Sequence, residues 1–164
     1  MTVDNLEEAE IVRQIKYVMG EAILEVKIPR PRRIFIHISP ISSKKTVRYL
    51  TKKMNFTHLS TITGVDLEGT IEVIYHLNYG GGIELSLKVH VPKDKPILPT
   101  VTDIIPGAIL YEREVHDLFG VTFKGHPDLS PLLLPEGWPQ DVYPLRKEWT
   151  IEKIEKEVGK GGRR

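Results

Sequence analysis

Cysteine is absent from the 164 residues, and this absence excludes several kinds of chemistry at once. Without thiols the chain has no disulfides, no thiolate nucleophile, no cysteine zinc site and no cysteine ligand for an iron–sulfur cluster. It also lacks any apolar run near the roughly 18 residues of a membrane helix, and its acidic start, DNLEEAE, is unlike a signal peptide. We therefore expect membrane contact only through partners.

An excess of charge of one sign is missing as well. Lys and Arg number 23 against 22 Asp and Glu, a formal net charge of +1, so no overall field would recruit nucleic acid. PRPRR at 29–33 and the basic residues of 44–53 leave a free-standing nucleic-acid-binding module as a distant alternative. A solvated charged face is favoured, because no stacking aromatics are interleaved. Scarce Asn and Gln with many Ile, Lys and Glu indicate a thermophile.

The first 99 residues predict an α+β domain. IEVIYHLNY (71–79) and IELSLKVHV (83–91) alternate with period two, and the glycines between them predict a hairpin. With 57–66 they form a three-strand meander, and 22–28 with 33–39 form another strand pair. Residues 6–20 and 42–54 have helical periodicity, the second with Ser42 or Ser43 as N-cap. We expect an antiparallel or mixed sheet with helices on one face.

The chain changes character after residue 91. PKDKPILP (92–99) is a proline-broken linker, after which we expect a helix from an N-cap at Thr102 or Asp103 to a stop at Gly120. One face of this helix is a continuous apolar stripe, formed by Ile104, Ala108, Tyr111, Val115 and Leu118. Its first two turns are apolar nearly all round, which indicates burial on more than one side. A second covering surface should come from another protein or from the chain's own tail.

The charged end of this helix, EREVHDLFG (112–120), has three interpretations. One is a solvated end with two helix pairs, Arg113–Asp117 and Glu112–His116, each worth about 0.3–0.5 kcal/mol. The second is an acid–base site of Glu112 or Glu114 with His116, which is disfavoured because no nucleophile or oxyanion loop accompanies it. The third, a metal site of His116, His126 and nearby acids, lacks the usual histidine spacing.

The segment that follows, residues 121–149, carries five prolines and little periodicity, yet it is rich in Leu and aromatic residues. Disordered tails lack such residues, so the composition predicts an ordered, extended strap. The strap either wraps its own domain or lies along a partner. In the second case Trp138 or Trp149 would be anchors and Arg146 a bidentate carboxylate clamp.

EREVHDLFG, GHPDL (125–129), LLLPEGW (132–138) and PLRKEW (144–149) together resemble the 30 kDa subunit family of respiratory complex I. That family includes the equivalent subunit of membrane-bound, ferredoxin-linked hydrogenase and sulfur-reducing complexes. The residues that match its signature are Glu112, Arg113, Glu114, Asp117, Leu118, Phe119 and His126. Ser130 and Pro131 stand where the family usually has basic residues, which puts any partner contact through such residues in doubt.

The resemblance implies a hydrophilic peripheral-arm subunit on the cytoplasmic side of the membrane, with no catalytic residue, metal or cofactor of its own. It implies packing against the hydrogenase-like large subunit, beside an iron–sulfur small subunit. Iron–sulfur clusters and, in a hydrogenase, a nickel–iron centre would lie in those partners. Residues 100–149 would be a docking helix and strap of the same domain, and 150–164 a short helix with a basic, mobile tail.

The resemblance also suggests which residues form the structural network and partner interface: Glu112, Arg113, Glu114, Asp117, Phe119, His126, Asp128, Trp138, Arg146 and Lys147. The complex it favours is ferredoxin-dependent and ion-translocating. The alternative is the same subunit in an NADH- or other donor:quinone oxidoreductase.

Overall fold

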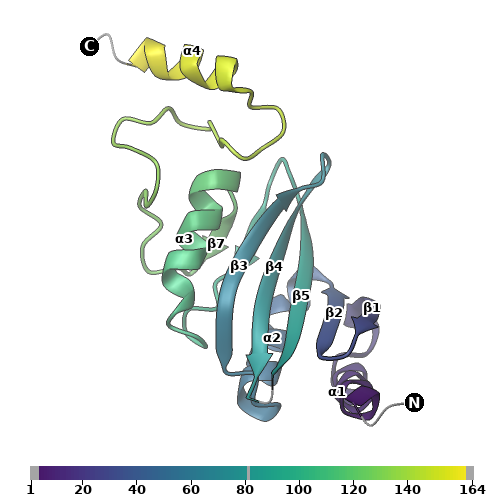
Figure 1. The fold of residues 1–164 in the computed structure, drawn as a ribbon. Helices are drawn as coiled ribbons and strands as arrows, with labels where there is room; N and C mark the ends of the chain where they lie inside the picture. The colour runs from purple at the N-terminus through teal and green to yellow at the C-terminus, as the bar shows by residue number, and fades with distance from the viewer. Residues whose placement is uncertain (1–3, 81, 162–164) are drawn as a thin grey trace.

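The computed structural model describes residues 4–80 and 82–161, and a five-stranded mixed sheet forms its centre (Figure 1). The spatial order is β1-β2-β5-β4-β3, and only β2 and β5 run parallel. The strands are β1 (Ile23–Arg30), β2 (Arg33–Ile38), β3 (His58–Asp66), β4 (Thr70–Tyr79) and β5 (Ile83–Pro92). The α+β class, the meander and the first strand pair are thus confirmed.

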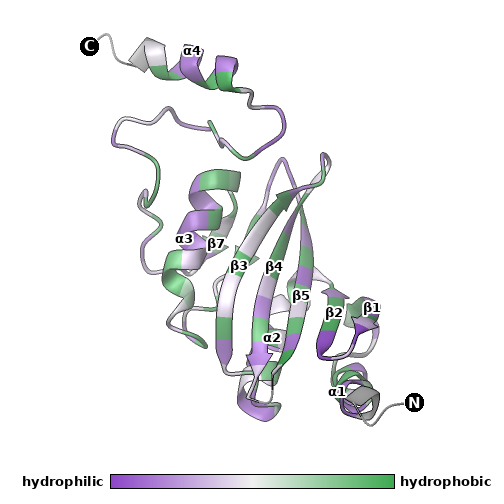
Figure 2. Ribbon diagram, viewed as in Figure 1, coloured by the Kyte–Doolittle hydropathy of each residue, from purple (hydrophilic) through white to green (hydrophobic). Residues whose placement is uncertain are grey.

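One face of the sheet is the core and the other is polar. The period-two pattern of β4 and β5 places Tyr75 opposite Leu87 in the core, where both are fully buried. Glu72 lies opposite His90 on the polar face, and its carboxylate accepts a 2.8 Å hydrogen bond from His90 Nε2. Figure 2 shows this alternation as bands of apolar and polar colour along the strands.

Three helices cover the core face. They are α1 (Asp4–Met19), α2 (Ser43–Lys53) and α3 (Ala108–Phe119), and the core cluster draws buried side chains from all three. Short 3₁₀ turns, η1 (Gly20–Ala22) and η2 (Pro40–Ser42), follow α1 and precede α2. The first two helices agree with prediction to within two residues. Ser42 is the N-cap of α2, but its side chain makes no capping bond, and Ser43 Oγ donates to Pro40 O (2.7 Å) instead.

Helix α3 starts later than the sequence predicts. Residues 101–107 form turns, and the helix begins at Ala108 after Gly107 rather than after Thr102 or Asp103. Pro106 disfavours helical geometry at the residue before it, which accounts for the delayed start. The helix ends where expected, at Gly120, whose φ of 73° closes it.

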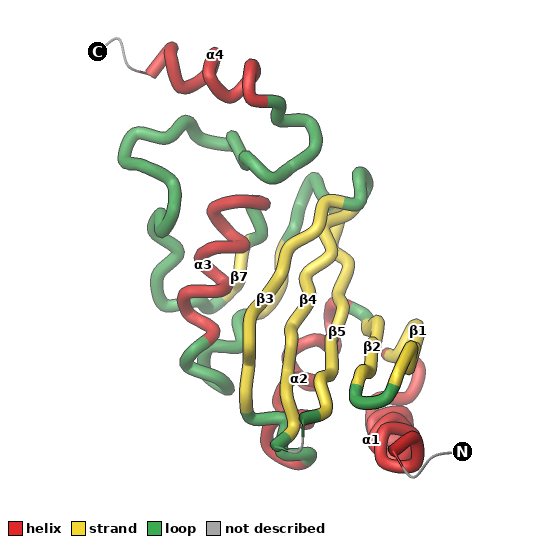
Figure 3. Tube along the Cα trace, in the orientation of Figure 1, coloured by secondary structure: helices red, strands yellow, loops and turns green. Residues whose placement is uncertain are grey.

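The proline-rich linker (92–99) contains a short strand that the sequence does not predict. β6 (Ile97–Pro99) pairs in parallel with β7 (Thr122–Lys124), so the segments on either side of α3 lie together. Residues 125–150 then run without helix or strand to α4 (Ile151–Gly161) (Figure 3). Among the described helices none combines the length and apolar character needed to cross a membrane. The expected basic tail reaches residues 162–164, which lie outside the described residues.

Candidate functional site

Glu112 is enclosed at the inner face of α3. Its side chain has no exposed surface, and its carboxylate accepts hydrogen bonds from Thr100 Oγ1 (2.6 Å) and from the amide of Val101 (2.8 Å). Burial raises the pKa of the Glu112 carboxyl to about 7, against the opposing effect of these two hydrogen bonds. Glu112 therefore fastens the loop before α3 to the helix itself.

His126 fastens the start of the segment that follows β7. Its Nε2 donates to the carbonyl oxygen of Ile109 (3.1 Å) and lies 3.9 Å from Glu112 Oε2, while its Nδ1 accepts from the amide of Asp128 (3.0 Å). Asp128 in turn accepts from the amide of Ser130 (2.8 Å), and this backbone bond holds the pKa of Asp128 below its usual value. The GHPDL turn is thus built around one enclosed imidazole.

Arg113 and Asp117 bind the next part of the chain, Ser130 to Leu134. Arg113 donates to the carbonyl oxygens of Ser130 (3.0 Å) and Pro131 (2.9 Å) and to Ser130 Oγ (3.1 Å). One oxygen of Asp117 accepts three consecutive backbone amides, those of Leu132 (2.7 Å), Leu133 (2.8 Å) and Leu134 (3.3 Å). We call residues 130–134 the clamped segment. The chain's own tail is therefore one surface that covers α3.

The C-terminal end of the strap (residues 121–149) is attached to the domain at a second place. Arg146 Nε donates to the carbonyl oxygen of Phe119 (2.8 Å), and its guanidinium lies 4.5 Å from the Tyr143 ring centroid. The amide of Lys147 donates to Asp66 Oδ2 (2.8 Å), which Lys93 Nζ also contacts at 2.6 Å. Arg146 thus binds a backbone oxygen of its own chain, and its contact with a partner carboxylate stays a prediction.

Asp66 anchors this second attachment and was not foreseen from the sequence. Burial opposes its ionisation, but hydrogen bonds from Lys93, Lys147 and Glu68 outweigh that effect and hold the pKa of Asp66 at about 2. A single Asp at the end of a strand carries no signal that distinguishes it from an ordinary turn residue, since its partner Lys147 is 81 residues away.

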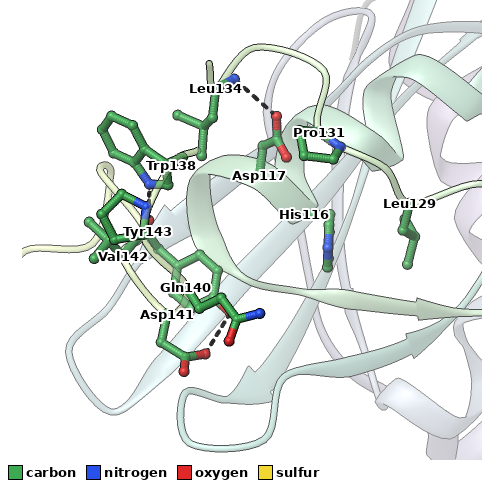
Figure 4. A pocket seen from close by; sticks show the side chains of 11 residues that line it. His116, Asp117, Leu129, Pro131, Leu134, Trp138, Gln140, Asp141, Val142 and Tyr143 are labelled. Carbon is green, nitrogen blue, oxygen red and sulfur yellow. Dashed lines mark hydrogen bonds between the residues drawn. The ribbon is translucent and has the colours of Figure 1, made fainter. Parts of the chain in front are cut away.

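Between the two attachments residues 135–144 form an arch. Trp138 Nε1 donates to the carbonyl oxygen of Val142 (2.8 Å) and closes the arch on itself. A cavity of about 400 Å³ lies between the arch and the end of α3, lined by Asp117, Trp138, Asp141 and Tyr143 among others (Figure 4). Part of the arch packs on the domain, since Val142 is buried and the Tyr143 ring lies against Gly120, while residues 135–137, 140 and 141 are exposed.

Glu112 and His116 do not contact each other. His116 Nδ1 donates to the carbonyl oxygen of Val121 (2.8 Å), so neither predicted helix pair forms: Glu112 contacts Thr100 and Val101, and Arg113 and Asp117 contact the clamped segment. Within residues 4–80 and 82–161 no three His, Asp or Glu side chains are grouped so as to hold a metal ion. Glu114 stands apart from the others and lines a shallow groove beside Gly64 and Phe119.

Comparison with known proteins agrees with this arrangement. Residues 36–155 match the family described as respiratory-chain NADH dehydrogenase, 30 kDa subunit. The chain belongs to this family. The matched range contains the helix, the clamped segment and the arch, so the residues described above lie inside the family's shared region.

Three relatives show the breadth of the family. A subunit of the F(420)H(2) dehydrogenase of Methanosarcina mazei is 34% identical over 142 residues, which are 85% of this chain and 89% of the relative. A subunit of the NADH-quinone oxidoreductase of a Roseiflexus species is 33% identical over 149 residues, 87% of this chain and 84% of the relative. A chain in the structure of the membrane-bound sulfane sulfur reductase, an archaeal respiratory membrane complex, is 34% identical with a TM-score of 0.77. That match covers 92% of this chain and 90% of the other. These relatives are thus chains of three different multi-subunit redox complexes.

Proposed function

We propose that the chain is a non-catalytic peripheral-arm subunit that docks on the hydrogenase-like large subunit of a complex-I-like membrane complex and stabilises it. The observation that carries this proposal is the fixed segment on α3, with exposed leucines on it and beside it. The exposed fraction of the residue surface is 56% for Leu110 on α3, 56% for Leu133 in the clamped segment and 53% for Leu145 beyond the arch. Exposed large apolar side chains along a fixed backbone are what a docking surface needs.

Asp117 explains why Leu133 is presented in this way. Because three successive amides converge on one carboxylate oxygen, the backbone of Leu132 to Leu134 is held against α3. An extended chain that is ordered before binding loses less conformational entropy when a partner covers it. Arg113 adds to this order at Ser130 and Pro131.

The partners would carry the redox chemistry. We place iron–sulfur clusters in the small subunit beside this chain and, in a hydrogenase, a nickel–iron centre in the large subunit. This chain would sit on the cytoplasmic side and touch the membrane only through partners. Its enclosed Glu112 and its lack of cysteine support a role without redox or catalytic groups.

Among the possible complexes we favour a ferredoxin-dependent, ion-translocating one of the sulfur-reducing type, with the hydrogen-evolving type next. The similarity to the sulfane sulfur reductase chain over 92% of the present chain supports this choice. A quinone-reducing complex with NADH or another electron donor is the alternative. It is supported by the F(420)H(2) dehydrogenase and NADH-quinone oxidoreductase subunits, which match nearly as much of the chain.

The test is purification in mild detergent through a tag at residue 1, followed by mass spectrometry and metal analysis. We expect the large subunit and the iron–sulfur small subunit to co-purify, and the nickel content to separate the hydrogen-evolving type from the others. Leu133→Lys should release the partners without unfolding the chain. Ile41→Lys is the matched control, because Ile41 is a 92% exposed apolar residue before α2. A stable monomer without partners would refute the docking proposal.

A further inference from the structure

The cavity under the arch differs chemically from the exposed leucines around it. Its lining brings two carboxylates, Asp117 from α3 and Asp141 from the arch, to the same space as the rings of Trp138 and Tyr143. Figure 4 shows the Asp117 and Asp141 side chains at separate ends of the lining, with Tyr143 between them in this view and Trp138 to the side, level with Asp117. Among the described residues no lysine or arginine belongs to the lining itself, and the nearest cation the geometry records is Arg146, whose guanidinium lies 4.5 Å from the Tyr143 ring centroid.

The ring N–H groups that could donate to an anion in this cavity already donate to carbonyl oxygens of this chain. Trp138 Nε1 donates to the carbonyl oxygen of Val142, and His116 Nδ1 donates to the carbonyl oxygen of Val121. The Tyr143 hydroxyl lies 3.4 Å from Asp141 Oδ1 and donates to it. Gln140 adds an amide that can donate or accept, while the side chains of Asp117, Asp141 and, in its neutral form, the imidazole of His116 present acceptors. The cavity therefore suits a cationic hydrogen-bond donor.

The shape of the cavity favours one kind of cation. Its volume of about 400 Å³ admits a whole long side chain, and the arch that forms it is fastened at both ends by Asp117 and Arg146. A guanidinium has a flat face that stacks on aromatic side chains and a fork that meets a carboxylate with two hydrogen bonds, and an ammonium has neither. The lining offers both kinds of surface, with the rings of Trp138 and Tyr143 and the carboxylates of Asp117 and Asp141.

We propose that this cavity receives an arginine side chain of the neighbouring subunit. The inference rests on the proposed function, since it needs the arch to face that subunit. It adds to that function the chemistry of a specific contact: the exposed leucines supply apolar area, and the arch selects one positively charged residue of the partner. A partner segment that placed an apolar or acidic side chain here instead of an arginine would be disfavoured by the two carboxylates.

The test compares Asp141→Asn with Glu136→Gln. The Asp141 backbone has φ of 60°, which Asn also adopts readily, so this substitution removes the charge and keeps the shape of the arch. Glu136 is an exposed carboxylate of the same arch that does not line the cavity. Each variant is bound to the remaining subunits of its complex, and the dissociation constant is measured.

We expect Asp141→Asn to weaken binding about tenfold or more, mainly through faster dissociation, and Glu136→Gln to leave it unchanged. Phenylglyoxal footprinting of the assembled complex should then find one partner arginine that is protected with the native chain and reactive with Asp141→Asn. A parallel footprint with acetic anhydride, which acylates lysine, would overturn the inference if a partner lysine were protected in this way, and so would the absence of a protected arginine.

The two proposals fail in distinguishable ways. If Asp141→Asn binds as tightly as the native chain while Leu133→Lys is released, docking through this face stands and the arginine site is wrong. If both variants bind as the native chain does, this face is not the docking surface and both proposals are refuted. Equal weakening by Glu136→Gln would show a diffuse effect of charge and would also overturn the inference of a specific site.

Discussion

Arg113 and Asp117 lie one turn apart on α3, with opposite charges, and each binds the backbone of the clamped segment rather than the other side chain. Arg113 donates to two carbonyl oxygens there, and Asp117 accepts three amides. The pair thus satisfies donors and acceptors of a chain that has no secondary structure to do so. This relationship suggests how the strength of the attachment can be measured.

Asp117→Asn should destabilise the chain by about 1–3 kcal/mol, because it weakens the charge-assisted bonds to three backbone amides. The free energy of unfolding measures the cost. Hydrogen exchange should show faster exchange at the amides of Leu132, Leu133 and Leu134. The control is Glu114→Gln, which changes a carboxylate on the same helix that has no hydrogen bond to the clamped segment. If both variants lose equal stability, Asp117 has no special role.

Arg113→Lys should also loosen the clamped segment. A lysine ammonium cannot reproduce the spacing of the guanidinium donors that reach Ser130 and Pro131 together. Ser130→Ala removes the hydroxyl that accepts from Arg113 and also bonds to the Asp128 carboxylate, and it should cost about 0.5–1.5 kcal/mol in the native background. In the Arg113→Lys background it should cost less. A double-mutant cycle on the free energy of unfolding checks this, and strict additivity would contradict it.

Ser130 is a position where the resemblance leads us to expect a basic residue. Its hydroxyl accepts from Arg113 and its amide donates to Asp128. A basic side chain could not accept the bond from Arg113. The loss of a partner contact at this position stays a prediction for the assembled complex.

Much of the domain could be predicted because its patterns are local. The hairpin of β4 and β5 followed from period-two alternation, and the end of α3 followed from Gly120. The parallel neighbours β2 and β5 could not be predicted, since their pairing joins residues more than 40 apart and leaves no local pattern in the sequence. The roles of Glu112 and Asp66 were hidden for the same reason: a sequence shows which carboxylates exist, and only the fold shows which of them are enclosed.

Gly64→Ala tests the contact between α3 and the sheet. A Cβ at Gly64 would lie 2.5 Å from the Phe119 ring, which is too close for any carbon pair, and Phe119 is buried. We expect a loss of about 1–3 kcal/mol from overpacking. Gly69→Ala is the control, because nothing lies within 4 Å of its Cβ position. Phe119→Leu should recover part of the loss in the Gly64→Ala background, and a further loss there would show that the ring is not the obstacle.

Glu112→Gln should change how stability depends on pH. The pKa of Glu112 in the folded chain is about 7, above its ordinary value of 4.5, so the folded state holds this proton more tightly than the unfolded state. Stability from this group is therefore fully present below pH 4.5, is lost as pH rises towards 7, and changes no further above that. The total is at most about 3 kcal/mol, at 1.36 kcal/mol for each unit of pKa shift.

Urea unfolding of the native chain and of Glu112→Gln between pH 4.5 and 8 measures this effect as a difference between the two curves. Taking the difference cancels the contributions of other titrating groups. One of these is His37, whose pKa is held below its usual value by burial and by the nearby His90. Glutamine mimics the protonated carboxyl, so the variant should gain on the native chain as pH rises. A constant difference across this range would mean that Glu112 is ionised throughout and that its bonds to Thr100 and Val101 outweigh its burial.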